Sequence, residues 1–160
     1  MRHEPIDIGA LLDRFRAGRR RFEGLLATIP LPRQIDTPPE RGGGARDLVA
    51  RFAGWLDDAN DRIPRLLAGA PCVEYDVAAF EAAAAQRAAE WTLQQVLGAF
   101  RRAADRFDVM IAESDPGELA ESPEVVAWLS AVAGRLMDAH MDGLERLAAR
   151  SSGDVEAGAI

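Results

Sequence analysis

The segment from Ala45 to Leu67, ARDLVARFAGWLDDANDRIPRLL, constrains the fold of this chain more than any other part. Its apolar residues recur at steps of three and four, which places them on one face of a long helix. These residues are Leu48, Phe52, Trp55, Ala59, Ile63 and Leu66. Pro64 predicts a kink near residues 60–62, because proline removes a helical hydrogen bond and crowds the preceding turn.

Composition points to one helical domain. The chain has 160 residues, enough for one well-formed core. Apolar residues make up 48%, with few aromatic residues, and much of that share is alanine, which favours helices. The net charge of −7 argues against a nucleic-acid-binding surface, which needs a basic face. The basic triplet at residues 19–21 is interpreted as part of the solvent-exposed face of a helix.

The remaining sequence predicts three more long helices and one short one. Asp7, Asp76 and Ser122 are predicted N-caps, and Thr92 with Gln95 forms a capping box. The predicted helices span residues 7–29, 45–67, 77–89, 92–115 and 122–150. Residues 30–44 hold four prolines and three glycines, which predicts a long crossover loop. The prediction is an all-α four-helix bundle over residues 1–150, followed by a flexible tail, 151–160.

His140 is the leading candidate for chemistry, because it lies on an apolar helix face between Leu136 and Leu144. It is either a buried histidine bonded to a backbone carbonyl or a carboxylate, or a base or ligand that lines a cavity. A metal would need three or four converging ligands, and the acidic residues nearby fall mostly on polar faces. We therefore expect no metal and no cofactor. The single cysteine, Cys72, allows neither an intramolecular disulfide nor a CxxC site.

Arg51 lies one turn before Trp55, at the border of the apolar face. Its guanidinium either reaches water along the methylene stem or turns inward to an acid or an anionic ligand, with Trp55 as a stacking surface. Asp58 extends the same border and could complete a polar patch. Tyr75 either offers its hydroxyl to a cavity or serves packing. Trp91 and Trp128 stand at helix starts, where an edge-of-core role is expected.

Several functional classes lack their motifs. No serine occupies a G-x-S-x-G turn, and the three glycines before Ala45 lack the lysine of a phosphate-binding loop. The first residues lead directly into a helix pattern, so no signal peptide is expected. No stretch approaches the roughly 18 apolar residues of a membrane span. We expect a cytoplasmic protein without nucleic-acid or membrane partners.

Three segments resemble a known family. ARDLVARFAGW resembles the second-helix signature of DinB-like four-helix bundles. The block YDVAAFEAAAAQRAAEWTLQQVLGAF, which is followed by ESDPGEL, resembles the ClbS/DfsB branch, and RLMDAHMDGLERL is similar to the family's final-helix segment. Together these segments cover about residues 8–148. The order and spacing of the three segments carry the resemblance.

The resemblance implies the bundle scaffold and its cavity, without the metal. Many DinB-like proteins bind a divalent ion through one histidine on the second helix and two on the fourth. The matching positions here are Arg51, Leu136 and His140, and only His140 can be a ligand. The ClbS/DfsB branch is associated with self-protection against DNA-damaging metabolites, in the known case by hydrolysis of a strained electrophilic ring without a metal.

The implied site is a cavity lined by the two aromatic residues Trp55 and Tyr75, with polar groups beside them. In this hypothesis Arg51 stabilises negative charge, and His140 or Asp58 acts as the base. Phe52 and Leu136 are predicted to contact the substrate as well.

Three functions stay open from the sequence. The first is a metal-free hydrolase or tailoring enzyme that acts on a reactive or hydrophobic metabolite. The second is a protein that binds or sequesters such a molecule without changing it, and the third is a metal-dependent thiol transferase or isomerase of the DinB group. A homodimer through Phe80, Trp91 or Trp128 is compatible with the sequence but not required by it.

Overall fold

The computed structural model describes residues 6–29 and 44–157, with side chains up to residue 150. Every regular element in these ranges is a helix, which confirms the all-α class. The elements are α1 (Ile8–Ala27), α3 (Ala45–Leu67), α4 (Val77–Arg87), α5 (Leu93–Glu113), α6 (Pro116–Glu121), α7 (Pro123–Ser130), the π-helical segment η2 (Ala131–Leu136) and α8 (Met137–Ala157).

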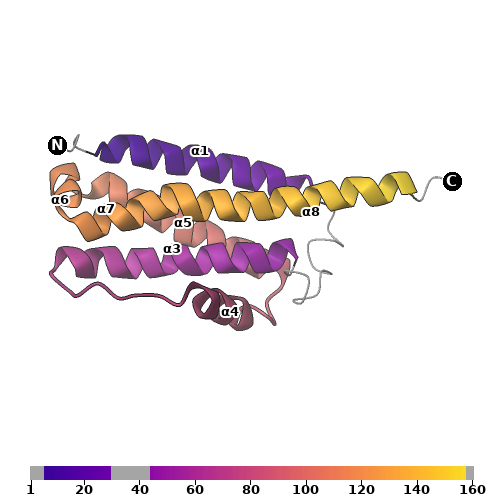
Figure 1. The fold of residues 1–160 in the computed structure, drawn as a ribbon, viewed down its shortest axis with the longest axis horizontal. Helices are drawn as coiled ribbons and strands as arrows, with labels where there is room; N and C mark the ends of the chain where they lie inside the picture. The colour runs from indigo at the N-terminus through magenta and orange to yellow at the C-terminus, as the bar shows by residue number, and fades with distance from the viewer. Residues whose placement is uncertain (1–5, 30–43, 158–160) are drawn as a thin grey trace.

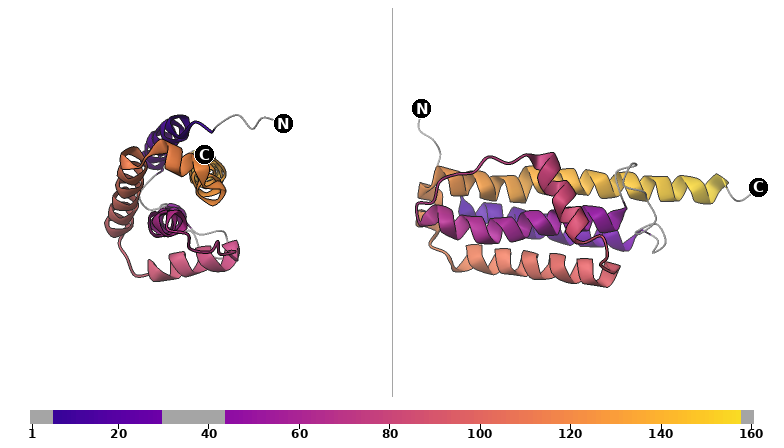
Figure 2. Two further views of the ribbon diagram at one scale, coloured as in Figure 1. Left: turned by 90° about the vertical axis from the view of Figure 1, so that its left-hand side faces the viewer. Right: turned by 90° about the horizontal axis from the view of Figure 1, so that it is seen from below.

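The long helices lie side by side along the longest axis of the molecule (Figure 1). Helices α7, η2 and α8 follow one another without a break and form a single long rod. The short helix α4 crosses the long helices instead of running along them (Figure 2). It is joined to α3 by an extended segment, residues 68–76, and packs against α3.

Helix α3 lies at the centre of the molecule, with α5, α8, α7 and α4 packed around it. The predicted apolar face is buried from Phe52 to Leu66, but Leu48 is only half-buried and its neighbour Val49 takes the buried position. Leu56 and Asn60 are buried too, since neighbours cover α3 on more than one side. The helix continues through Pro64 to Leu67.

The predicted helix starts are confirmed by their caps. Asp7 and Asp76 each accept a hydrogen bond from a backbone N–H three residues later, at 3.0 Å. Thr92 and Gln95 form the reciprocal capping box. Ser122 caps α7. Each cap satisfies an N–H that the first helical turn leaves without an intrahelical partner.

The last predicted helix differs from expectation in two ways. It contains the π-helical segment Ala131–Leu136, a rare conformation that the apolar periodicity did not predict. The backbone is also helical through Ala157, past the predicted helix end at residue 150, and the flexibility of the tail from Ser151 stays a prediction. The predicted crossover, residues 30–44, lies outside the described residues except for Gly44, the N-cap of α3.

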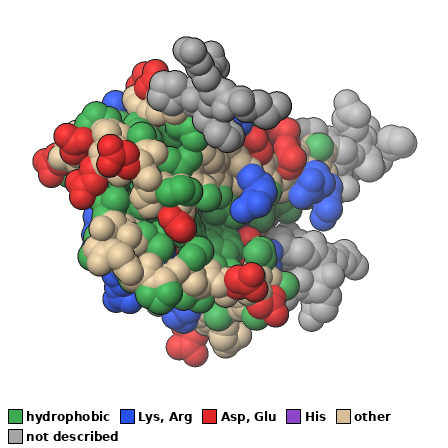
Figure 3. Space-filling model, turned by 60° about the vertical axis from the view of Figure 1, so that its left-hand side comes forward, with side chains coloured by type: hydrophobic (Ala, Val, Ile, Leu, Met, Phe, Trp, Pro, Cys, Tyr) green, Lys and Arg blue, Asp and Glu red, His purple; other side chains and the backbone are tan. Residues whose placement is uncertain are grey.

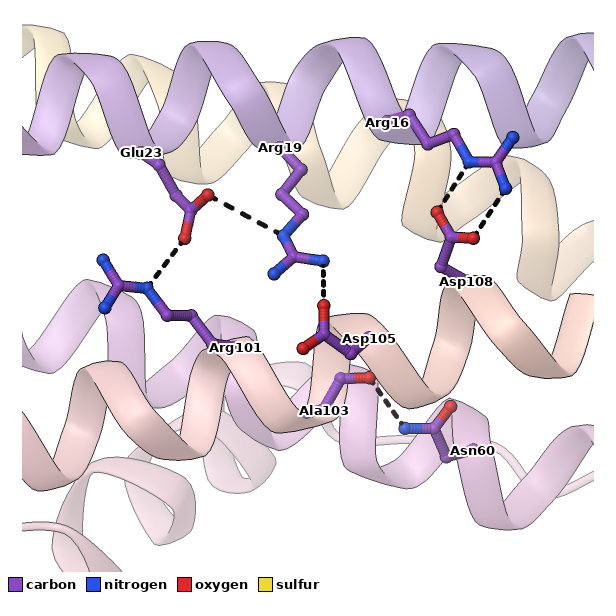
Figure 4. A network of polar contacts seen from close by, with 8 residues as sticks. All are labelled: Arg16, Arg19, Glu23, Asn60, Arg101, Ala103, Asp105 and Asp108. Carbon is purple, nitrogen blue, oxygen red and sulfur yellow. Dashed lines mark hydrogen bonds and ion pairs between the residues drawn. The ribbon is translucent and has the colours of Figure 1, made fainter.

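Ion pairs join α1 to α5 along one side of the molecule (Figure 4). Arg16 forms a two-pronged pair with Asp108, with both N–O distances at 2.7 Å. Arg19 meets Asp105 at 2.6 Å, and Glu23 accepts a bond from Arg101 at 3.1 Å. Arg16 and Glu23 therefore bind across to α5. We refer to these pairs as the α1–α5 ladder.

Within the described ranges, no helix has a stretch that is both long and apolar enough to cross a membrane.

Candidate ligand-binding site

A cavity of about 770 Å³ lies beside α3, between α4 with its preceding segment and the α7–η2–α8 rod. Cavities of this size hold drug-sized ligands. Figure 3 shows a face of the molecule that is hollowed at its middle, with hydrophobic side chains in the hollow and charged side chains around it. The rod contributes Ala127, Ala131, Arg135 and Ala139, which recur at steps of four, and Ala131 and Arg135 lie in its π-helical segment.

Three aromatic rings form part of the cavity wall: Trp55 on α3, Tyr75 just before α4, and Trp128 on α7. The ring of Tyr75 lies edge-on to both tryptophans, with centroid distances of 5.6 Å to Trp55 and 5.5 Å to Trp128. The centroids of the two indoles are 6.1 Å apart. Phe80 stacks against Trp55 at 4.0 Å and fixes its orientation. This part of the wall is therefore aromatic, and its rings contact one another.

Glu81 on α4 brings a carboxylate to this wall. The indole N–H of Trp55 donates a hydrogen bond to its Oε1 atom at 3.0 Å. No donor in the described part of the chain reaches the other oxygen, Oε2. The side chain is 24% exposed, so its charge is partly removed from water without a protein cation beside it. An oxygen in this position is available to a ligand.

His140 lies behind the wall rather than in it. It is 3% exposed and stacks on Phe52 with a centroid distance of 4.9 Å. Its Nδ1 atom is 2.7 Å from the carbonyl oxygen of Leu136, and a carbonyl can only accept, so Nδ1 carries the proton. The other nitrogen, Nε2, is then an acceptor when the ring is neutral, and it lies 3.9 Å from Oε1 of Glu81.

Burial lowers the pKa of His140 below its ordinary value of 6.5, because an apolar surrounding disfavours the charged ring. The hydrogen bond to Leu136 and the nearby carboxylate of Glu81 act in the opposite direction, and Arg51 adds to the lowering. His140 is thus neutral at pH 7. The sequence left open whether this histidine is bonded to the backbone or lines a cavity, and the structure shows the backbone bond.

Tyr75 belongs to a separate polar chain. Its hydroxyl donates to Asp58 at 2.5 Å and accepts from Nε of Arg62 at 3.1 Å. Burial raises the pKa of Tyr75 above 10.0, and the hydrogen bond to Asp58 raises it further. The hydroxyl therefore stays protonated and fully bonded, and Tyr75 presents its ring to the cavity.

The candidate residues from the sequence divide into two groups. Trp55, Tyr75 and Leu136 line the cavity. The remaining four do not line it; they are Arg51, Phe52, Asp58 and His140. Phe52 is a fully buried core residue. Arg51 is half-buried, and its Nε atom has no hydrogen-bond partner among the described residues.

Sequence reasoning missed Glu81 and underrated Trp128. Glu81 is the single acidic residue of the alanine-rich helix α4. That was the available signal, because no basic residue stands three or four positions from Glu81 on its own helix. Trp128 was assigned to the edge of the core. It does pack half-buried against the core, and its ring also lines the cavity from α7, which the sequence could not place beside Tyr75.

The residues at the family's metal positions do not fit a metal. Of Arg51, Leu136 and His140, only the histidine is a donor, and its Nδ1 is already bonded. Among the residues that the structure describes, no three side chains of histidine, cysteine, aspartate or glutamate converge. Comparison with protein-family models, curated proteins and solved structures finds no match to this chain.

Proposed function

We propose that this protein binds a small, largely apolar molecule in the cavity beside α3. The observation that carries the proposal is the wall itself, in which three oriented aromatic rings surround a space of about 770 Å³ and a carboxylate oxygen is left without a donor. Apolar walls with a few placed polar groups are the usual make-up of ligand sites. A carboxylate oxygen that is partly removed from water without a donor costs free energy, and a bound ligand could offset that cost.

The scaffold is proposed to be a DinB-like four-helix bundle of the ClbS/DfsB type. The lengthwise packing of α1, α3, α5 and the α7–η2–α8 rod supports this, as does the short helix α4 before α5 (Figure 1). The family resemblance adds self-protection against a reactive metabolite as the biological role.

Metal-free hydrolysis is the second candidate function, and Glu81 favours it. Its free Oε2 atom on the cavity wall is placed to take a proton from a water molecule as the water oxygen bonds to an electrophilic carbon. The bond from that carbon to its leaving atom breaks, and the leaving atom takes up the proton that Glu81 received, which restores the carboxylate. Glu81 replaces Asp58 as the base in this scheme, because Asp58 is occupied by Tyr75 and does not line the cavity.

The remaining two residues of the predicted catalytic set take positioning roles. His140 lies beside Glu81, and Arg51 lies near enough to His140 to influence its pKa. A metal-dependent transferase is not supported, because His140 is the one possible metal ligand among Arg51, Leu136 and His140.

Filling the cavity tests the proposal. Ala139 lines the cavity, and Ala139→Trp should abolish the binding of aromatic alcohols, amines and acids measured by calorimetry. Ala112→Trp is the matched control, since Ala112 is exposed on α5 and does not line the cavity. Unchanged binding by Ala139→Trp, or no binding of any compound by the native chain, contradicts the proposal. Mass spectrometry of the recovered ligand separates binding from hydrolysis.

A further inference from the structure

We infer that the ligand of this cavity carries a protonated primary or secondary amine, held between Glu81 and the aromatic wall. This inference rests on the proposed function and goes beyond it by assigning the ligand's charge. Three features of the wall carry it: the pairing of Glu81, the arrangement of the rings, and the balance of charges around the cavity.

Glu81 is a carboxylate without a counter-ion. Its neighbours are the Trp55 N–H and the neutral His140, and no arginine of the described residues lies within ion-pair distance. The ion pairs of the α1–α5 ladder show the contrast, because each of those carboxylates has a guanidinium within 4 Å. A partly desolvated charge without a partner is costly, and a cation from the ligand would remove that cost.

The rings suit a cation as well. Tyr75, Trp55 and Trp128 contact one another at angles of 61°, 83° and 51°, so the cavity that they line is bordered by rings of differing orientation. The electron-rich faces of aromatic rings attract cations, most strongly when water is excluded. Tyr75 already attracts one cation, since the guanidinium carbon of Arg62 lies 5.8 Å from its ring centroid.

The charges around the cavity favour a cation over an anion. Glu81 and Glu124 both line it, against a single basic residue, Arg135, which is exposed. The acceptors also favour an amine that keeps N–H groups. Oε2 of Glu81 lacks a donor among the described residues, so a quaternary ammonium, which has no N–H, would leave it unsatisfied.

Three matched probes test the inference by calorimetry at pH 7: 1-naphthylmethylamine, 1-naphthylmethanol and 1-naphthylacetate. They share the same aromatic body and carry a positive, a neutral and a negative group. We expect the amine to bind at least ~10-fold more tightly than the alcohol, the size of a partly buried cation–π contact with a charge partner. The acetate is expected to bind most weakly.

Glu81→Gln should lower the affinity for the amine to that for the alcohol and leave the alcohol unchanged. The glutamine oxygen can still accept the Trp55 N–H, so the wall keeps its bond. Glu90→Gln is the control, because it removes one negative charge from an exposed residue that does not line the cavity.

The outcomes separate the inference from the function on which it rests. If amine and alcohol bind equally, or the acetate binds best, the inference is wrong and the proposed function stands. If none of the probes binds, both fail. The comparison within the native chain needs no variant, so a folding defect in Glu81→Gln would not obscure the result.

Discussion

Two regions of the molecule, the α1–α5 ladder and the cavity beside α3, place charge in opposite ways. On the α1–α5 ladder, each arginine meets a carboxylate at 2.6–3.1 Å, and the helices lie closely joined (Figure 4). Across the molecule, α4 stands away from the rod and leaves the cavity between them. There the carboxylate of Glu81 has no arginine partner in the described ranges.

The difference separates stability from binding. Charges that already have partners hold helices together, and charges without partners are available to a ligand. The aromatic residues follow the same division. Phe22, Phe52 and Phe100 pack together in the closed core, whereas Trp55, Tyr75 and Trp128 border empty space. If the division holds, substitutions in the closed core and the ladder change mainly stability, and substitutions at the cavity change mainly ligand binding.

The largest effect is expected for Phe22→Ala in the closed core. Phe22 is 0% exposed and contacts Phe52 and Phe100. Removing its ring leaves a cavity in packed surroundings and should cost about 3–5 kcal/mol of unfolding free energy in urea titrations. Trp128→Ala on the open wall should cost clearly less and lose ligand binding. Equal losses of stability would show that the cavity wall is as tightly packed as the core.

The next effect is expected where α4 contacts α3. A Cβ atom built on Gly54 would lie 2.9 Å from Cβ of Ala84, so Gly54→Ala must push α4 outward. We expect a loss of about 1–3 kcal/mol from overpacking. Because Glu81 moves with α4, binding of 1-naphthylmethylamine should weaken too. Adding Ala84→Gly should restore both, and a failure to restore binding would mean that the position of α4 does not set the site.

A smaller effect is expected from His140 as the pH changes. Burial lowers its pKa in the folded state, so above pH 6.5 the ring is neutral in both states and full stability is present. As the pH falls from 6.5 toward the lowered folded pKa, only the unfolded chain takes up the proton, and stability is lost. Urea titrations at pH 7.5 and 5.5 should show this loss in the native chain and a smaller one in His140→Gln. An equal loss in both would assign the effect to other groups.

The smallest effect is expected in the α1–α5 ladder. Arg16 lowers the pKa of Asp108 below 3.8 through their hydrogen bonds, so the pair stabilises the fold above that pH. The contribution is lost as the pH falls through the lowered folded pKa. Asp108→Asn should raise the pH of acid unfolding slightly, with unchanged ligand binding. Asp138→Asn, at an exposed and longer pair, should shift it less; the reverse order would mean that burial does not decide the strength of these pairs.

The local signals of the sequence predicted the helices well. Capping residues and apolar periodicity act within one or two turns, so Asp7, Asp76, Thr92 and Ser122 could be assigned without knowing the neighbours. The apolar face of α3 was predicted too narrowly. A helix covered on several sides buries residues outside its main face, and Val49 and Leu56 show this.

The candidate site was predicted only in part, because several of its contacts join residues that are far apart in the sequence. Trp55 and Tyr75 were assigned to a cavity and do line one, but they meet Trp128 from a distant part of the chain. His140 was rightly placed on an inward face, yet which of its two environments it occupies depends on Leu136 and Glu81. Partners of that kind leave no trace in the spacing of residues along one helix.

The sequence by itself determined the helical class, the starts of the helices and the inward face that holds Trp55 and His140, because these follow from contacts between near neighbours in the chain. Only the tertiary structure decided that α4 crosses the long helices, that the rod contains a π-helical turn, and that Glu81 stands unpaired among aromatic rings. Those features depend on contacts between helices that are far apart in the sequence. The packing of the whole fold decides such contacts, and the conformational preferences of short segments do not.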